Sequence, residues 1–218
     1  MQRLRSSRSW SDLLSNVVLF VSLGLAIAAW AGRFKRLDSP PAPVEIVGDW
    51  ARFVPLGNTV GDASATLHVI VFGDYQCPAC KAFETSLETV KKSLGSTLAI
   101  TYVNYPLAYH TFAVPAANAA DCAAAQGEFL SMHRALFASQ DSLGKIQMLD
   151  LARRIGIPNL RSFAECMLEA QRNSRNRQPA EAVATLQITG TPTVIADGKL
   201  VRGAAPPAHL QRLLVDRN

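Results

Sequence analysis

An apolar run that leads into two closely spaced cysteines limits the folds open to this chain more than any other feature. Residues 66–72 (TLHVIVF) indicate a strand buried on both faces, because nearly every side chain is apolar. Cys77 and Cys80 follow shortly after, and Pro78 between them is typical of a first helical position. The two thiols therefore lie where a buried strand passes into a helix.

Residues 78–94 have the apolar spacing of an amphipathic helix, which Gly95 can end. The apolar positions are Phe83, Leu87, Val90 and Leu94. A helix N-terminus carries unpaired N–H groups and partial positive charge, which favour a thiolate over a thiol. We therefore predict a redox pair in which Cys77 is the nucleophile and Cys80, one turn further on, resolves the mixed disulfide.

A CxxC pair also occurs as one half of a zinc site. Structural zinc takes four ligands, usually supplied as two close pairs. The other two cysteines, Cys122 and Cys166, are far apart and have no Cys or His partner at ligand spacing. We therefore expect no metal and no cofactor.

The positive charge of the chain is confined to its N-terminus. Residues 1–36 carry six of the 22 Lys and Arg residues and one of the 17 Asp and Glu, which accounts for the whole formal net charge of +5. No basic surplus remains on the globular part, so we expect no nucleic-acid binding.

Between the basic clusters, Leu13 to Ala31 form an uncharged stretch long enough to cross a bilayer as a helix. Cleavage after Ala31, at an Ala-Trp-Ala sequence, is the alternative. We favour an uncleaved signal-anchor, because basic residues flank both ends closely. Four cysteines suit an oxidising compartment, so we expect a single-pass protein of the cytoplasmic membrane with its globular part on the extracytoplasmic, periplasmic side.

The remaining pattern predicts one α/β domain with a mixed central sheet. We divide the chain into a basic segment at 1–12, a transmembrane signal-anchor at 13–32, a linker and lead-in at 33–65 and a globular domain at 66–218. Strands are predicted at 67–72, 98–103, 193–196 and 199–202, with Asp197-Gly198 as a hairpin turn. Helices are predicted at 113–126, 128–138, 146–155, after a cap at Asn159, at 175–187 and at 207–215.

These residues resemble the thioredoxin superfamily, and within it the DsbA-type thiol–disulfide oxidoreductases with a helical insertion. Four stretches carry the resemblance: residues 72–80 (FGDYQCPAC), residues 105–117 around Tyr105-Pro106-Leu107 and His110, residues 124–137 (AAQGEFLSMHRALF), and Gly190-Thr191-Pro192-Thr193. The resemblance implies a thioredoxin-like fold with an all-helical insertion at about 108–188.

The resemblance also assigns site residues. It implies a cis bond before Pro192, which would lie beside the Cys77–Cys80 redox disulfide, and a Thr191 backbone that binds the substrate chain. It further implies a structural disulfide between Cys122 and Cys166, although two buried free thiols are the alternative. Catalysis would thus rest on Cys77, Cys80 and Pro192.

Two residues depart from the family pattern. Many thioredoxins have a buried acid in the strand before the first cysteine, and here that position is Val71. Asp74 is the nearest carboxylate, and a loop or capping role explains it equally well. The second residue between the cysteines is Ala79, whereas the best-known strong oxidants have a histidine, so the redox poise stays open. We expect His133 and His209 on helix surfaces and assign His110 no chemistry.

The resemblance implies a monomeric enzyme that forms disulfides in exported proteins with free cysteines. The resemblance also implies a quinone-linked membrane partner that reoxidises it. A disulfide reductase or isomerase on the same fold is one alternative. An isomerase usually needs a dimer with facing active sites, and we find no dimerisation domain in the sequence. A copper-delivery module and a structural scaffold are alternatives of other classes, but copper modules have a wider cysteine spacing.

Overall fold

The computed structural model describes residues 19–25, 27, 44–62, 64–173 and 179–215. The chain divides into two units, Met1–Pro43 and Val44–Asn218. The predicted transmembrane segment at 13–32 lies outside the described residues except for 19–25 and 27, which are helical. Within the described ranges, no helix has both the length and the apolar character needed to cross a membrane.

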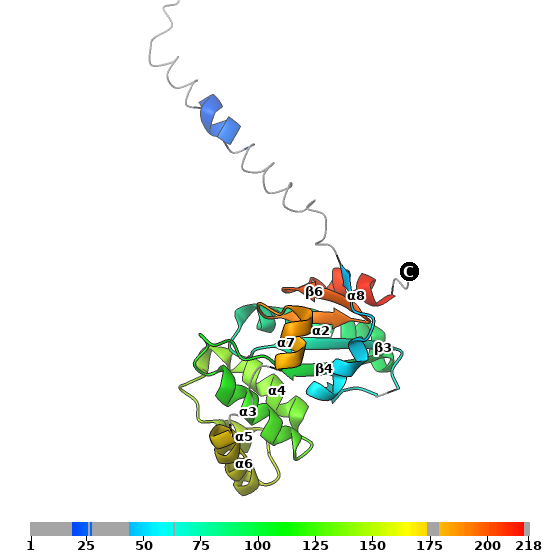
Figure 1. Ribbon diagram of the computed structural model, residues 1–218. Coiled ribbons are helices and arrows are strands. Elements are labelled where there is room, and N and C mark those ends of the chain that lie inside the picture. The colour runs from blue at the N-terminus through cyan, green and yellow to red at the C-terminus, as the bar shows by residue number, and fades with distance from the viewer. Residues whose placement is uncertain (1–18, 26, 28–43, 63, 174–178, 216–218) are drawn as a thin grey trace, which may run out of the picture. The chain divides into compact units, whose positions relative to one another are not determined.

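A six-stranded mixed sheet forms the centre of the second unit, in the order β1-β6-β5-β3-β4-β2 (Figure 1). Its middle strand β3 (Leu67–Gly73) runs parallel to β4 (Leu98–Asn104) and antiparallel to β5 (Thr193–Ala196). The strand β6 (Lys199–Arg202) pairs with β5 across the predicted Asp197-Gly198 turn. Both turn residues have positive φ, as such a hairpin requires. The mixed α/β sheet expected from the sequence is confirmed.

The segment predicted as a lead-in supplies both edges of the sheet. The strand β1 (Glu45–Ile46) pairs with β6, and β2 (Asn58–Val60) pairs with β4. A short 3-10 helix, η1 (Trp50–Leu56), connects them. The residue directly before β2 is Gly57, and only glycine fits there because a Cβ would overlap the carbonyl group of Tyr102. The two edge strands are too short to show an alternating pattern in the sequence.

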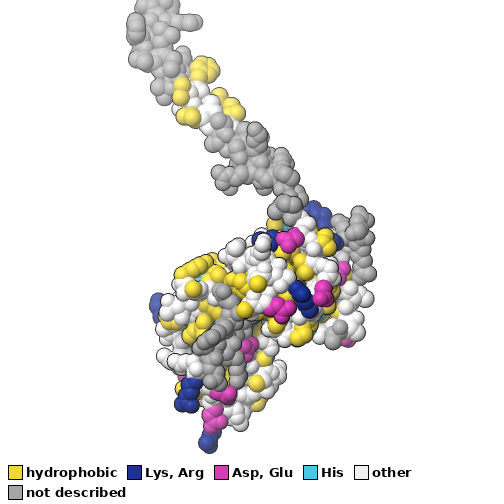
Figure 2. Space-filling view, viewed as in Figure 1, with side chains coloured by type: hydrophobic (Ala, Val, Ile, Leu, Met, Phe, Trp, Pro, Cys, Tyr) yellow, Lys and Arg dark blue, Asp and Glu magenta, His cyan; other side chains and the backbone are white. Residues whose placement is uncertain are grey.

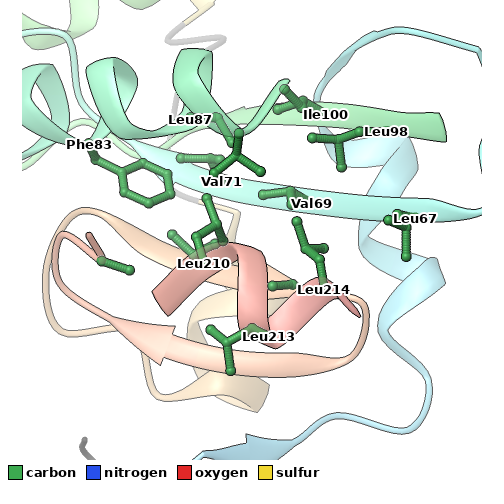
Figure 3. Close-up of a cluster of buried hydrophobic side chains, with 14 residues drawn as sticks. Leu67, Val69, Val71, Phe83, Leu87, Leu98, Ile100, Leu210, Leu213 and Leu214 are labelled. Atoms are coloured by element: carbon green, nitrogen blue, oxygen red, sulfur yellow. The ribbon is translucent and has the colours of Figure 1, made fainter. Parts of the chain in front are cut away.

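Two helices cover one face of the sheet. The amphipathic helix α2 (Pro78–Leu94) packs beside α8 (Pro207–Val215). Figure 3 shows Phe83 and Leu87 of α2 and Leu210 and Leu214 of α8 on the side of β3 that carries Val69 and Val71. Alternate β3 residues Ile70 and Phe72 pack on the opposite face, with Phe53 of η1 and Leu186 of α7 (Ala180–Leu186). The double burial explains why β3 is almost entirely apolar.

Helices between β4 and β5 form a second core. They are α3 (Ala113–Ala124), α4 (Phe129–Ala138), α5 (Met148–Arg154) and α6 (Leu160–Asn173), with the 3-10 turn η3 (Gln140–Ser142) after α4. Figure 1 shows these four helices gathered on the β4 side of the sheet, away from β6. The side chain of Asn159 accepts the Ser162 N–H and so caps α6, as the sequence predicted. Cys122 of α3 and Cys166 of α6 are joined by a disulfide, the pairing that the resemblance implied.

The surface of this unit carries mixed charge. Figure 2 shows Lys and Arg side chains interspersed with Asp and Glu on the face in view. Ion pairs between them include Arg202 with Glu45 and Arg153 with Asp150. Such exposed pairs each contribute little to stability, about 0–1 kcal/mol.

Candidate active site

The two cysteines lie at the start of α2, as the sequence predicted. Cys77 is the N-cap residue and Pro78 is the first helical residue, so the missing proline N–H costs no hydrogen bond. The carbonyl oxygen of Cys77 accepts the N–H groups of Cys80 and Lys81, which closes the first turn. Both sulfurs are free thiols, with Cys77 6% exposed and Cys80 2% exposed. The redox pair is therefore nearly enclosed, with Cys77 on the outer side.

The loop before β5 brings Thr191 and Pro192 to the redox pair. The Thr191–Pro192 peptide bond is cis, as expected from the sequence. The Cys77 Sγ lies 3.5 Å from the Thr191 carbonyl oxygen, to which the thiol form donates. These residues are far apart in the sequence and meet because β5 pairs with β3.

The two thiols have very different acidities. The pKa of Cys77 is lowered to about 5, first by the hydrogen bond from the Cys80 thiol and further by Thr191 and the N–H groups of Ala79 and Cys80. Burial opposes this shift but does not cancel it. The pKa of Cys80 is strongly raised, first by the same hydrogen bond to Cys77 and then by burial. At neutral pH the pair therefore holds one proton, on Cys80.

This difference predicts the pH dependence of alkylation. We expect the rate at which iodoacetamide modifies the reduced protein to rise with a midpoint near pH 5 and to level off above it. The modification should fall on Cys77, since Cys80 is buried and remains a thiol. Peptide mapping by mass spectrometry measures both points, and the urea-unfolded protein, with a midpoint near pH 9, is the control. A folded-state midpoint above pH 8 would contradict the assignment.

Asp74 holds the loop before the redox pair rather than capping α2. Its side chain is fully buried and accepts three hydrogen bonds, from the N–H groups of Gln76 and Leu107 and from Nδ1 of His110. The backbone N–H of Asp74 in turn points to the Cys80 Sγ at 3.4 Å. His110, to which we assigned no chemistry from the sequence, thus helps to hold the loop before Cys77.

We expect Asp74→Asn to destabilise the protein by about 1–3 kcal/mol. The asparagine offers one acceptor oxygen, and its amide group would face an N–H donor that Asp74 now satisfies. Urea unfolding of the reduced protein measures the loss. The exposed Asp62, whose carboxylate binds only Ser64 of its own turn, supplies the control variant Asp62→Asn. Equal stability of the two variants would show that the Asp74 hydrogen bonds contribute nothing.

Gln140, from η3 of the helical region, also binds the active-site loop. Its Nε2 donates to the carbonyl oxygens of Tyr75 at 2.7 Å and of Cys77 at 3.0 Å. Sequence analysis did not identify Gln140 as a site residue, because a single glutamine after a helix has no pattern that indicates a role. The geometry makes it a positioning residue for the first turn of α2.

His133 is buried, so the expectation of a surface position was wrong. It is 3% exposed and is surrounded by four aromatic rings: Tyr75, Tyr102, Phe129 and Phe137. The reason is that α4 turns this face toward α2 and β4, which the spacing within α4 alone does not reveal. His209 is partly exposed on α8. Nowhere in the described part of the chain do three or more His, Cys, Asp or Glu side chains form a group that could hold a metal ion.

The comparison with known families matches this geometry. The thioredoxin family model matches residues 55–216, which include the redox pair, the helical region and the Pro192 loop. The chain belongs to the thioredoxin family, and its fold is that of the DsbA-like members.

Solved structures share this fold at low sequence identity. A thioredoxin-like oxidoreductase from Silicibacter pomeroyi superposes with a TM-score of 0.63 at 23% identity, over 73% of this chain and 91% of that chain. BdbD from Bacillus subtilis, in its oxidised form, gives a TM-score of 0.63 at 19% identity, over 80% and 99%. The thiol–disulfide exchange protein alpha-DsbA2 from Wolbachia pipientis gives 0.62 at 18% identity, over 79% and 90%.

Curated relatives with higher identity are larger proteins. The Na(+)/H(+) antiporter NhaA 1 of Mycobacterium sp. (strain KMS) is 31% identical over 201 residues, which are 90% of this chain and 33% of the antiporter. The Na(+)/H(+) antiporter NhaA 3 of Salinispora tropica is 32% identical over 146 residues, which are 66% of this chain and 22% of the antiporter. The chain thus spans about a third or less of the length of these curated relatives.

Proposed function

We propose that the protein is a thiol–disulfide oxidoreductase that forms disulfide bonds in exported proteins. The observation that carries the proposal is the division of acidity within the Cys77–Cys80 pair. Cys77 is a thiolate at neutral pH and lies on the outer side, whereas Cys80 is a buried thiol. A reactive outer thiolate with an inner resolving thiol is the arrangement that disulfide exchange requires.

The reaction runs in two exchanges. A substrate thiolate attacks the Cys77 sulfur of the oxidised pair, so that a substrate–Cys77 disulfide forms and the Cys77–Cys80 bond breaks. A second substrate thiolate then attacks the substrate sulfur of this mixed disulfide, which releases Cys77 as a thiolate. The substrate has lost two electrons and the enzyme pair has gained them. Cys77 leaves readily because its pKa is low.

Thr191 and Pro192 form the substrate-binding side of the site in this proposal. Proline has no N–H, so the cis loop presents carbonyl groups toward Cys77 without a competing donor at that residue. An extended substrate chain would pair with the Thr191 backbone next to the attacked sulfur. We assign Pro192 a positioning role in catalysis.

The direction of electron flow follows from the same acidity. A low Cys77 pKa stabilises the reduced pair relative to the disulfide, which makes the pair a stronger oxidant. A quinone-linked membrane partner would remove the two electrons after each cycle. We propose that residues 13–32 anchor the protein in the cytoplasmic membrane with its catalytic domain on the periplasmic side. A C-terminal alkaline phosphatase fusion, active only outside the cytoplasm, tests this orientation.

The reduction potential of the Cys77–Cys80 pair tests the proposed direction. We expect roughly −120 to −180 mV for the full chain equilibrated in glutathione buffers at neutral pH. Because the reduced pair binds one proton above pH 5, the potential should fall by about 30 mV per pH unit there, and by about 60 mV per unit below pH 5. A value near roughly −270 mV would instead indicate a disulfide reductase.

The alternative function of a different class is copper delivery, in which the same two thiols would bind Cu(I). Titration of the reduced protein with Cu(I) distinguishes the two. Stoichiometric binding that survives competition by a strong chelator would favour metal delivery over disulfide exchange.

A further inference from the structure

A small buried cavity borders the inner cysteine. Its volume is about 20 Å³, and its lining includes Cys80 together with Glu84 of α2 and His133 of α4. The hydroxyl-bearing rings of Tyr75 and Tyr102 and the side chain of Asp74 also line it. A cavity of this volume has room for about one water molecule.

The buried histidine points to such a water. His133 Nδ1 lies 3.0 Å from the Tyr75 hydroxyl. Its Nε2 lies 3.2 Å from Glu84 Oε2, yet the angles do not make a hydrogen bond, and this nitrogen has no other partner. Buried polar atoms are nearly always hydrogen-bonded, to protein or to ordered water. A water molecule in this cavity would therefore supply the hydrogen-bond partner that His133 Nε2 lacks.

The surrounding groups set the proton positions in this cluster. The pKa values of Tyr75 and Tyr102 are both raised, first by burial and then by nearby carboxylates that include Glu84, so both hydroxyls keep their protons. Tyr102 donates its hydroxyl to Glu84 Oε2 at 3.3 Å. We assign Tyr75 as the donor to His133 Nδ1, which leaves the imidazole proton on Nε2, beside the Glu84 carboxylate.

The same pair also reaches solvent. A surface groove of about 290 Å³ is lined by Lys81, Glu84, Thr85, Glu88, His133, Arg134, Phe137 and Ala138. Glu84, His133 and Phe137 therefore line both the groove and the cavity. The Glu84 side chain is 14% exposed, whereas the Asp74 side chain is fully buried and its carboxylate already accepts three hydrogen bonds. Of these two carboxylates, only Glu84 connects Cys80 with the outside.

Disulfide exchange at this site needs a proton at Cys80. The pKa of the buried Cys80 thiol is strongly raised, so its sulfur must gain a proton when it leaves and lose one when it attacks. Resting on the oxidoreductase function proposed above, we propose that the Glu84–His133 pair exchanges this proton with the Cys80 sulfur through a water in the cavity.

Protons are conserved both when the Cys77–Cys80 disulfide is broken and when it forms. When a substrate thiolate attacks Cys77, the electron pair of the broken Cys77–Cys80 bond leaves on Cys80. Glu84 takes up a proton from the groove, and the water passes this proton to the sulfur while His133 Nε2 stays beside Glu84. When Cys80 attacks a Cys77 mixed disulfide, its proton passes the other way and the substrate leaves as a thiolate. The charged groups around the path are Lys81, Glu88 and Arg134 in the groove and Asp74 in the cavity.

A stopped-flow reaction of the reduced protein with Ellman's reagent separates the two sulfurs. Cys77 attacks first and releases one thionitrobenzoate, in a phase whose rate depends on the reagent concentration. Cys80 then attacks the mixed disulfide and releases the second, in a phase that is independent of the reagent concentration. We expect Glu84→Gln to slow the second phase by about tenfold or more at neutral pH and to leave the first unchanged. The variant rate should then rise in proportion to hydroxide, more steeply than that of the parent protein.

Three comparisons make the result decisive. Glu88→Gln changes a carboxylate one turn away that lines the groove but not the cavity, and we expect both phases to be unaltered. His133→Gln should slow the second phase as Glu84→Gln does, and circular dichroism checks that each variant is folded. An unchanged second phase in folded Glu84→Gln, with the parent pH dependence, would overturn the proton route. Failure of the oxidoreductase proposal would look different, because the first phase of the parent protein would be no faster than that of an unfolded control.

Discussion

Replacing Cys80 with alanine is expected to leave Cys77 in a persistent mixed disulfide with its substrate. In the parent protein, Cys80 lies one turn from Cys77 within α2, and its attack releases any disulfide formed on Cys77. Intramolecular attack of this kind has a very high effective concentration. Without Cys80, only an external thiol can release the substrate, so we expect release to slow by roughly a thousandfold or more at millimolar thiol. Non-reducing electrophoresis after mixing reduced Cys80→Ala with a disulfide-linked peptide measures the adduct.

The reciprocal variant is the matched control. In Cys77→Ala the remaining thiol is the buried Cys80, whose exposure is 2%, so we expect no adduct. Adduct formation by Cys80→Ala should also begin at a higher pH than the first exchange in the parent protein. The hydrogen bond from Cys80 is the largest cause of the low Cys77 pKa, and its removal raises that pKa. An adduct on Cys77→Ala but not on Cys80→Ala would reverse the two assigned roles.

Removing the Cys122–Cys166 disulfide is expected to cost roughly 4 kcal/mol of unfolding free energy, from the lost restriction of the unfolded chain. The bond closes a loop that contains α4 and α5 and joins the helices α3 and α6, which pack against each other. Urea unfolding of Cys122→Ala/Cys166→Ala measures the loss. The reduction potential of the Cys77–Cys80 pair should stay the same, because Cys122 and Cys166 both pack in the core of the helical region.

A reductant would also act on Cys77 and Cys80, so the chemical control uses a variant that lacks these two thiols. Cys77→Ala/Cys80→Ala retains only the Cys122–Cys166 pair, and the unfolding of this variant with and without reductant isolates that bond. Agreement between the genetic and the chemical loss would support the assignment. Equal stability with and without reductant would show that the helical core holds α3 and α6 together without the bond.

The sequence predicted those elements whose pattern is set by local physics. The strand β3 is buried on both faces and is therefore apolar throughout, and α2 begins at a proline and ends at a glycine. The two strands joined by Asp197-Gly198 also had clear signals and occur with the predicted bounds. The bounds of the edge strands β1 and β2 could not be predicted, because each strand is held by a longer neighbour in the sheet rather than by its own pattern.

The candidate site could be predicted only where its residues are adjacent in the chain or belong to a known pattern. Cys77, Cys80, Thr191 and Pro192 were found in this way. Sequence analysis noted that Val71 occupies the place of a buried acid, but not that Glu84 lines the same cavity as Val71. That arrangement depends on how α4 packs against α2, since His133 meets Glu84 only in the folded domain. Tertiary packing of this kind has no local signature.

The hydrogen bonds from Gln140 to Tyr75 and Cys77 have a consequence for the nascent chain. The ribosome adds Cys77 and Cys80 to the growing chain well before Gln140, and it adds Thr191 later still. Until those residues have been made, the first turn of α2 lacks the hydrogen bonds from Gln140, and Cys77 lacks the contribution of Thr191 to its low pKa. In a chain that has not yet reached Gln140 and Thr191, Cys77 is therefore less acidic than in the folded domain, and it gains its full acidity only after those residues have been made.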